Sequence, residues 1–227
     1  MDSGNIGFVL LCAAFVFVMT PGLAMFYGGL VRKKNVVNTM MTSIFIIGVG
    51  IVMWVLFGYS LSFAPSGNAF IGDFRWLGLE GVSLTEGYTD DASIPNMVFS
   101  AFQMMFAVIT PALITGAVAG RMKFKSIFVF TIFWSLIVYY PLAHMVWGQG
   151  GLLGADGIGA LDFAGGDVVH ISSGVSALVL CILLGKRHDY EHSIYRIHNI
   201  PTVVLGASLL MFGWFGFNAG SALAADG

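Results

Sequence analysis

The chain alternates between six long apolar runs and shorter polar connections. Each run is free of charged side chains over roughly 20 residues, the length that an α-helix needs to cross about 30 Å of hydrocarbon. The runs lack the strict apolar–polar alternation of a barrel strand. The pattern predicts an all-α integral membrane protein, a polytopic helical bundle that occupies residues 1–227 as one membrane domain. The predicted helices are approximately 7–31, 36–63, 97–120, 126–147, 168–185 and 200–223.

Basic residues gather in the connections that follow the odd-numbered helices, whereas Arg75 alone follows an even-numbered helix. Because Lys and Arg concentrate on the cytoplasmic side of membrane proteins, we expect the odd connections to be cytoplasmic. The chain is then a multi-pass protein of the cell membrane with an extracellular or periplasmic N-terminus. The second connection, 64–96, becomes an acidic external cap. The basic residues concerned are Arg32, Lys33, Lys34, Arg121, Lys123, Lys125, Lys186, Arg187 and Arg196.

Composition narrows the possible functions. Hydrophobic residues make up 57% of the chain and charged residues 10%, against about 25% charged residues in a soluble domain. The 10 Lys and Arg nearly balance the 12 Asp and Glu, so we expect membrane lipid and not nucleic acid around this chain. It carries no P-loop, HExxH or GxSxG motif, which argues against an enzyme. Cys12 and Cys181 lie in apolar runs and are interpreted as free thiols, so no cofactor or metal is predicted.

Three ionisable residues lie in or beside the apolar runs, where charged groups are costly and often functional. His170, near the start of the fifth predicted helix, is either a core histidine bonded to a neighbouring helix or a pore-lining group. For His144, near the outer end of the fourth helix, a structural role is favoured. Asp162 precedes the fifth helix and can cap its backbone N–H groups. It can equally provide negative potential at a cation entrance, and these two roles are compatible.

Aromatic residues suggest a site for a small cation. Phe102 and Phe106 are four residues apart and share a helix face, which by itself is typical of packing. Trp147 ends the fourth helix on the expected outer side, where a membrane-belt tryptophan is the usual interpretation. Ser221 places a hydroxyl at the outer end of the sixth helix. If Phe106, Trp147 and Ser221 converge, they form a cage with cation–π faces and an oxygen that accepts an N–H bond.

Five segments, in order along the chain, resemble the ammonium transporter (Amt/Mep/Rh) family. Together they cover essentially the whole chain, which resembles the N-terminal portion of that family, about its first six transmembrane helices. The resemblance implies the first half of an eleven-helix, trimeric fold in which helices one to five and six to ten form an inverted repeat around a pore. The segments are 21–35, 143–148, 161–166, 168–171 and 213–221.

The resemblance also implies roles for individual residues. Phe106, Trp147 and Ser221 match the outer ammonium recruitment site, and Asp162 matches the acidic residue needed for recruitment. The remaining matches lie deeper: Phe106 and Phe217 form a phenyl gate, His170 is the first of two pore histidines, and Phe102 and Trp214 line the pore beside them. The second pore histidine belongs to the half of the family fold that this chain lacks.

The implied function is recruitment of ammonium at the outer site and conduction of ammonia through a narrow apolar pore. Implied partners are ammonium or ammonia, two further copies in a homotrimer, and a PII-type cytoplasmic signal protein. Three alternatives stay open: an ammonium sensor coupled to a signalling domain, a gas or methylammonium channel of the Rh branch, and a half-protein that does not transport alone.

Overall fold

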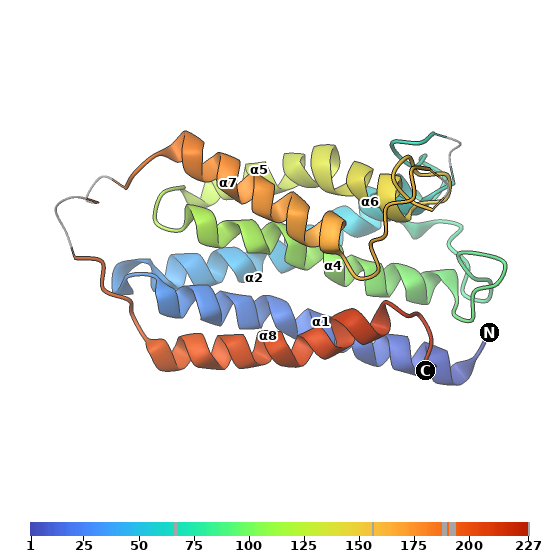
Figure 1. The fold of residues 1–227 in the computed structure, drawn as a ribbon, viewed down its shortest axis with the longest axis horizontal. Coiled ribbons are helices and arrows are strands. Elements are labelled where there is room, and N and C mark those ends of the chain that lie inside the picture. Colours follow the sequence, from blue (N-terminus) through green and yellow to red (C-terminus); the bar gives the residue numbers. More distant parts are fainter. Residues whose placement is uncertain (66–67, 156, 188–189, 191–193, 227) are drawn as a thin grey trace.

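A computed structural model describes residues 1–65, 68–155, 157–187, 190 and 194–226 as a bundle of long helices (Figure 1). Within these residues there is no strand, and six helical segments are long and apolar enough to cross a membrane. This confirms the predicted all-α membrane bundle. The segments are Ser3–Leu30, Lys33–Phe63, Asn96–Val118, Phe124–Trp147, Gly166–Leu184 and Ile200–Gly220.

Three of the spans are single α-helices, and three contain a π-helical segment in which the backbone turn is widened. The single helices are α1 (Ser3–Leu30), α4 (Asn96–Val118) and α8 (Ile200–Gly220). The second span consists of η1 (Lys33–Asn35), α2 (Val36–Met53), the π-segment η2 (Trp54–Gly58) and α3 (Tyr59–Phe63). The fourth span consists of α5 (Phe124–Trp134), the π-segment η4 (Ser135–Tyr139) and α6 (Tyr140–Trp147). The fifth span consists of the π-segment η5 (Gly166–Ile171) and α7 (Ser172–Leu184). A short 3₁₀ turn, η3 (Leu77–Leu79), lies in the connection before α4.

The first and last spans differ from their predicted limits for local reasons. The first helix begins at Ser3 because the Asp2 side chain accepts the Asn5 backbone N–H at 2.8 Å and caps it. The last ends at Gly220, before the predicted Leu223, because Leu223 adopts a φ of 58° and turns the chain out of the helix.

The bundle has two distinct ends, which Figure 1 shows at opposite sides of the picture. The end at the right of Figure 1 holds both termini, the described part of the cap over 68–95, and the connection before the fifth span. We call it the vestibule end, after the cavity described below. The basic end holds the connections after α1, α4 and α7, where the basic residues of the sequence prediction lie.

Helix α8 lies along α1 because glycines remove the side chains between them. A Cβ at Gly206 would lie 2.6 Å from the Gly22 carbonyl oxygen, and one at Gly216 would lie 2.7 Å from that of Cys12. The two backbones are therefore in direct contact over much of their length. This packing fixes the orientation of α8 and directs Phe217 toward α4.

Helix α4 occupies the centre of the bundle and packs against α1, α2 and α7. The Trp54 indole, at the start of η2, donates to the Ser100 carbonyl oxygen at 3.2 Å. Phe102 and Phe106 are each only 1% exposed. The central helix thus presents its two phenyl rings to the interior and not to lipid.

The cap is held on the vestibule end by ring stacking and by His144. Trp76 stacks on Tyr59 with centroids 5.4 Å apart, and Tyr88 stacks on Phe99 at 4.8 Å. The fully buried His144 ring has Nδ1 3.1 Å from the Ser62 carbonyl oxygen and Nε2 2.8 Å from that of Asn68. It therefore joins α6 to the start of the cap, in agreement with the structural role favoured from the sequence.

Candidate functional site

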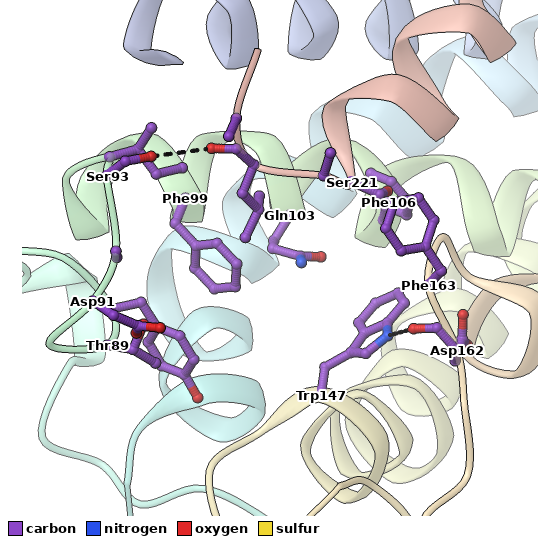
Figure 2. A pocket seen from close by; sticks show the side chains of 16 residues that line it. Thr89, Asp91, Ser93, Phe99, Gln103, Phe106, Trp147, Asp162, Phe163 and Ser221 are labelled. Atoms are coloured by element: carbon purple, nitrogen blue, oxygen red, sulfur yellow. Dashed lines mark hydrogen bonds between the residues drawn. The ribbon is translucent and has the colours of Figure 1, made fainter. Parts of the chain in front are cut away.

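A cavity of about 440 Å³ opens at the vestibule end, between the cap, α4, the end of α6 and the residues that follow α8. Figure 2 shows Phe106, Trp147, Asp162 and Ser221 around it, each contributed by a different part of the chain. Positions far apart in the sequence, such as Phe106 and Ser221, are thereby brought to one surface. We refer to this cavity as the vestibule.

Trp147 is held in a fixed orientation on the vestibule wall. Its indole Nε1 donates to the Asp162 carbonyl oxygen at 2.9 Å. Its ring meets that of Phe106 nearly at right angles, with an interplanar angle of 89° and centroids 6.0 Å apart. Because the indole N–H is already bonded, what remains for a ligand is the π-surface of the ring, which attracts cations.

Ser221 is oriented as a hydrogen-bond acceptor. Its hydroxyl donates to the Phe217 carbonyl oxygen at 2.8 Å, one turn back in α8. A serine oxygen carries one proton and two lone pairs. Since the proton is engaged, the lone pairs are available to a ligand that offers N–H groups.

Asp162 caps the fifth membrane span. Its Oδ1 accepts the backbone N–H groups of Gly165 at 2.5 Å and Gly166 at 2.8 Å, and its Oδ2 accepts those of Asp167 at 2.8 Å and Val168 at 2.9 Å. Gly165 makes this turn possible, because its φ of 90° is open to glycine but strained for other residues. These four bonds show Asp162 in the first of its two expected roles, the capping of the fifth span. Asp162 also belongs to the lining of the vestibule, where its charge is available for the second role.

Phe106, which lines the vestibule, packs against Phe217 behind it, with the two ring planes inclined by 32°. Phe106 and Phe217 have centroids 4.2 Å apart, and each side chain is 1% exposed. Phe102 supports Phe106 edge-on at 5.0 Å. The two buried rings are therefore in direct aromatic contact behind the vestibule.

His170 and Trp214 continue the line of rings beyond Phe217. The His170 imidazole stacks on Phe217 at 5.8 Å and lies 5.3 Å from the Trp214 ring. Within the part of the chain that the structure describes, its ring nitrogens have no hydrogen-bond partner. His170 is only partly buried and Trp214 is 42% exposed, so these two residues lie on an uncovered side of the bundle, at α7 and α8.

Comparison with known proteins gives this arrangement a context. The sequence pattern of the Ammonium Transporter Family matches residues 7–227. The chain belongs to this family. It is 53% identical over 227 residues to the ammonium transporter of Bacillus subtilis strain 168, covering 100% of this chain and 54% of that relative. It is 42% identical over 226 residues to the ammonium transporter Amt1 of Archaeoglobus fulgidus, again over 100% of this chain and 54% of the relative.

Solved structures of the family share the fold. The structure superimposes on Saccharomyces cerevisiae Mep2 with a TM-score of 0.88 at 38% identity, covering 99% of this chain and 50% of that one. A protein described as a sensor Amt protein matches with a TM-score of 0.83 at 29% identity, over 98% of this chain and 56% of its own. This chain therefore spans about half the length of the relatives that it matches.

The vestibule also contains Gln103, a polar residue that the sequence analysis missed. Gln103 lies on α4 between the two phenylalanines and lines the vestibule (Figure 2). Its Oε1 is buried and has no hydrogen-bond partner among the described residues. The available signal was an uncharged amide inside an apolar run, a group that requires a partner in a membrane interior.

Among the described residues, no group of three or more His, Cys, Asp and Glu side chains could hold a metal ion. Cys12 and Cys181 are both free thiols.

Proposed function

We propose that this chain supplies the recruitment site and one wall of the pore of an ammonium transporter. The observation that carries the proposal is the unbroken series of ring contacts from Trp147 through Phe106, Phe217 and His170 to Trp214. The series starts in the vestibule, passes the buried rings of Phe106 and Phe217, and ends at the partly exposed His170 and Trp214. It offers a cation an attractive entrance and then an apolar barrier.

Recruitment combines three kinds of attraction. The faces of Trp147 and Phe106 provide cation–π contact, and the Ser221 oxygen accepts an N–H bond. The buried Gln103 oxygen provides a second acceptor for a tetrahedral cation with four N–H groups. Asp162 keeps Trp147 in place through its backbone carbonyl and adds negative potential through its carboxylate.

Passage beyond the vestibule requires ammonium to give up its charge. A dry contact between Phe106 and Phe217 opposes a hydrated ion, so charge separates at this gate and neutral ammonia crosses when the rings part. His170 lies directly behind the gate. There it either relays the released proton or holds ammonia through a hydrogen bond, and imidazole suits both roles because its proton affinity is easily tuned.

We further propose that the uncovered side of His170 and Trp214 is covered by the other half of the transporter fold. In this arrangement the basic end faces the cytoplasm, the vestibule end faces outward with the N-terminus, and three copies assemble in the membrane. A PII-type signal protein would then approach the basic end. The similarity to Amt and Mep proteins over half of their length supports this arrangement.

Ammonium uptake by the full-length protein in liposomes tests the gate. Phe217→Leu should lower uptake at least about tenfold, equivalent to about 1.4 kcal/mol of lost differential stabilisation. Phe215→Leu is a matched control two residues along the same helix, because Phe215 is 70% exposed and points away from the core. Equal uptake by both variants, at equal amounts of folded protein, would contradict the proposed gate.

An ammonium sensor is the second candidate, favoured by the match to a sensor Amt protein. In a sensor the vestibule would bind ammonium and report occupancy to a signalling domain. The same liposome assay separates the two functions, since a sensor binds ammonium without net uptake. Binding that is lost in Trp147→Leu, in a protein with no uptake, would favour the sensor.

A further inference from the structure

One wall of the vestibule, residues 221–224, follows α8 in a strained turn. Ser221 and Leu223 line the vestibule just after α8 ends at Gly220. Leu223 has a φ of 58°, in the left-handed region where the Cβ of a leucine crowds the backbone. Such a conformation persists only where surrounding contacts hold it, and it is commonest at binding sites. The contacts that hold this turn therefore help to shape the vestibule.

Asn5, in the first turn of α1, joins this turn to the cap. Its Nδ2 donates to the Ser93 Oγ at 2.9 Å, and its Oδ1 accepts the Ala225 backbone N–H at 2.9 Å. These partners lie 88 and 220 residues away in the sequence. Asn5 itself is outside the lining of the vestibule, so its amide supports the wall from behind.

Ser93 completes the link between the cap and the turn. Its hydroxyl accepts the bond from Asn5 and donates to the Leu223 carbonyl oxygen at 3.5 Å (Figure 2). Its own carbonyl oxygen accepts the Asp2 backbone N–H at 2.8 Å, which fixes the cap on the start of α1. We refer to the side chains of Asn5 and Ser93, with the backbone of Leu223 and Ala225, as the clasp.

The side chain of Asn5 is suited to the clasp and is not needed to begin the helix. A carboxamide offers a donor and an acceptor on one planar group, whereas a carboxylate only accepts. The cap of α1 is made by another residue, since the Asp2 Oδ1 accepts the Asn5 backbone N–H at 2.8 Å. Both polar atoms of the Asn5 side chain are thereby committed to the cap and to the turn after α8.

We propose that Asn5 is a positioning residue of the recruitment site, because the clasp holds the wall that carries Ser221 in its place around the vestibule. This inference rests on the proposed function, since it gives Asn5 a part in recruiting ammonium. Phe217 depends instead on the glycine contact between α1 and α8, which includes Gly216. The clasp should therefore affect recruitment of ammonium and leave its passage through the gate unchanged.

Ammonium uptake by the full-length protein in liposomes, measured over a range of ammonium concentrations, tests the proposal. Asn5→Ala should raise the half-saturating concentration at least about threefold, the effect of losing one ordinary hydrogen bond. The reason is that the wall then leaves its binding geometry in a fraction of the molecules, and apparent affinity falls by that fraction. The maximal rate should stay close to that of the parent, because the gate is unaltered.

Two sets of variants separate positioning from simple loss of structure. Asp2→Ala is the matched control, because it removes the cap of the same helical turn and leaves the Asn5 side chain in place. It should keep the half-saturating concentration of the parent. Ser93→Ala should raise this concentration as Asn5→Ala does, and Ser93→Thr, which retains the hydroxyl, should keep the parent value. The serine pair decides the question if Asn5→Ala fails to fold.

Hydrogen exchange of residues 221–226 tests the clasp without any transport. Asn5→Ala should speed exchange in this segment, and Asp2→Ala should leave it unchanged. An unaltered half-saturating concentration in Asn5→Ala, an equal rise in Asp2→Ala, or an effect confined to the maximal rate would overturn the positioning role. Unchanged exchange in Asn5→Ala would overturn the clasp itself, even in a protein with normal uptake. Absence of both uptake and ammonium binding in the parent would instead refute the proposed function.

Discussion

At the scale of single residues, hydrogen bonds in the vestibule determine what each group can still offer a ligand. The Trp147 N–H and the Ser221 proton are both engaged, so a ring face and an oxygen lone pair remain. The buried Gln103 oxygen is an acceptor as well. The proposed recruitment of ammonium would use these remaining groups, because a cation that donates N–H bonds can contact the ring face and both oxygens.

Asp162 provides a test at this scale, because its cap and its charge can be separated. An asparagine has one acceptor oxygen, and its amide group would face N–H donors that the carboxylate now accepts. Asp162→Asn should therefore lower the free energy of unfolding by about 2–4 kcal/mol, from two lost charge-assisted bonds, and should abolish uptake. Denaturant unfolding and liposome uptake measure the two effects.

Asp167→Asn is the matched control for this substitution. It removes the same charge five residues along, where the bond to Asp162 uses the Asp167 backbone N–H and not its carboxylate. It should leave stability nearly unchanged. If both variants lost stability and uptake equally, local charge and not the cap would explain the importance of Asp162.

At the scale of elements, the sequence predicts where helices lie much better than how they are wound. Runs without charges locate the spans because burying a charged group in hydrocarbon is costly. The π-segments η2, η4 and η5 are absent from that prediction, since one extra residue in a turn leaves the run equally apolar. The segment η5 matters for the site, because it contains His170 and follows directly from the Asp162 cap.

The contact between α1 and α8 gives a prediction at the element scale. Gly216→Ala would place a Cβ 2.7 Å from the Cys12 carbonyl oxygen and 2.6 Å from the Phe15 Cβ. The helices must then separate, which should cost about 1–3 kcal/mol of stability and reduce uptake by moving the adjacent Phe217. Thermal unfolding and uptake of the full-length protein report both changes.

Gly174→Ala is the control for this helix contact. A Cβ at Gly174, in α7, would have no neighbour within 4 Å. Alanine favours the helix over glycine by up to about 1 kcal/mol, so this variant should be as stable as the parent or slightly more so. Equal losses in the two variants would show that close helix packing is not what Gly216 provides.

At the scale of the whole molecule, the sequence supplied the members of the site but could not show by itself that they meet. Phe106, Trp147 and Ser221 each stood out by residue type and position in a span. Their juxtaposition depends on the glycine contact between α1 and α8 and on the Asp162 cap, which are long-range or geometric features. Gln103 was missed because a single amide in an apolar run stands out less than a histidine or a charge.

The last prediction follows from the exposure of His170 and Trp214, which no other element of the described residues covers completely. In this chain Trp214 is 42% exposed and His170 is only partly buried, so both would face lipid or an ill-formed cleft if nothing covered them. A polar group left unsatisfied in hydrocarbon costs about 2 kcal/mol or more. We therefore expect residues 1–227 alone to conduct no ammonium in liposomes, to be less stable than the full-length transporter, and to self-associate. The full-length protein should show uptake that His170→Ala reduces. The opposite result would be uptake by residues 1–227 that equals uptake by the full-length protein and is abolished by His170→Ala. It would show that six spans enclose a working pore without a second half.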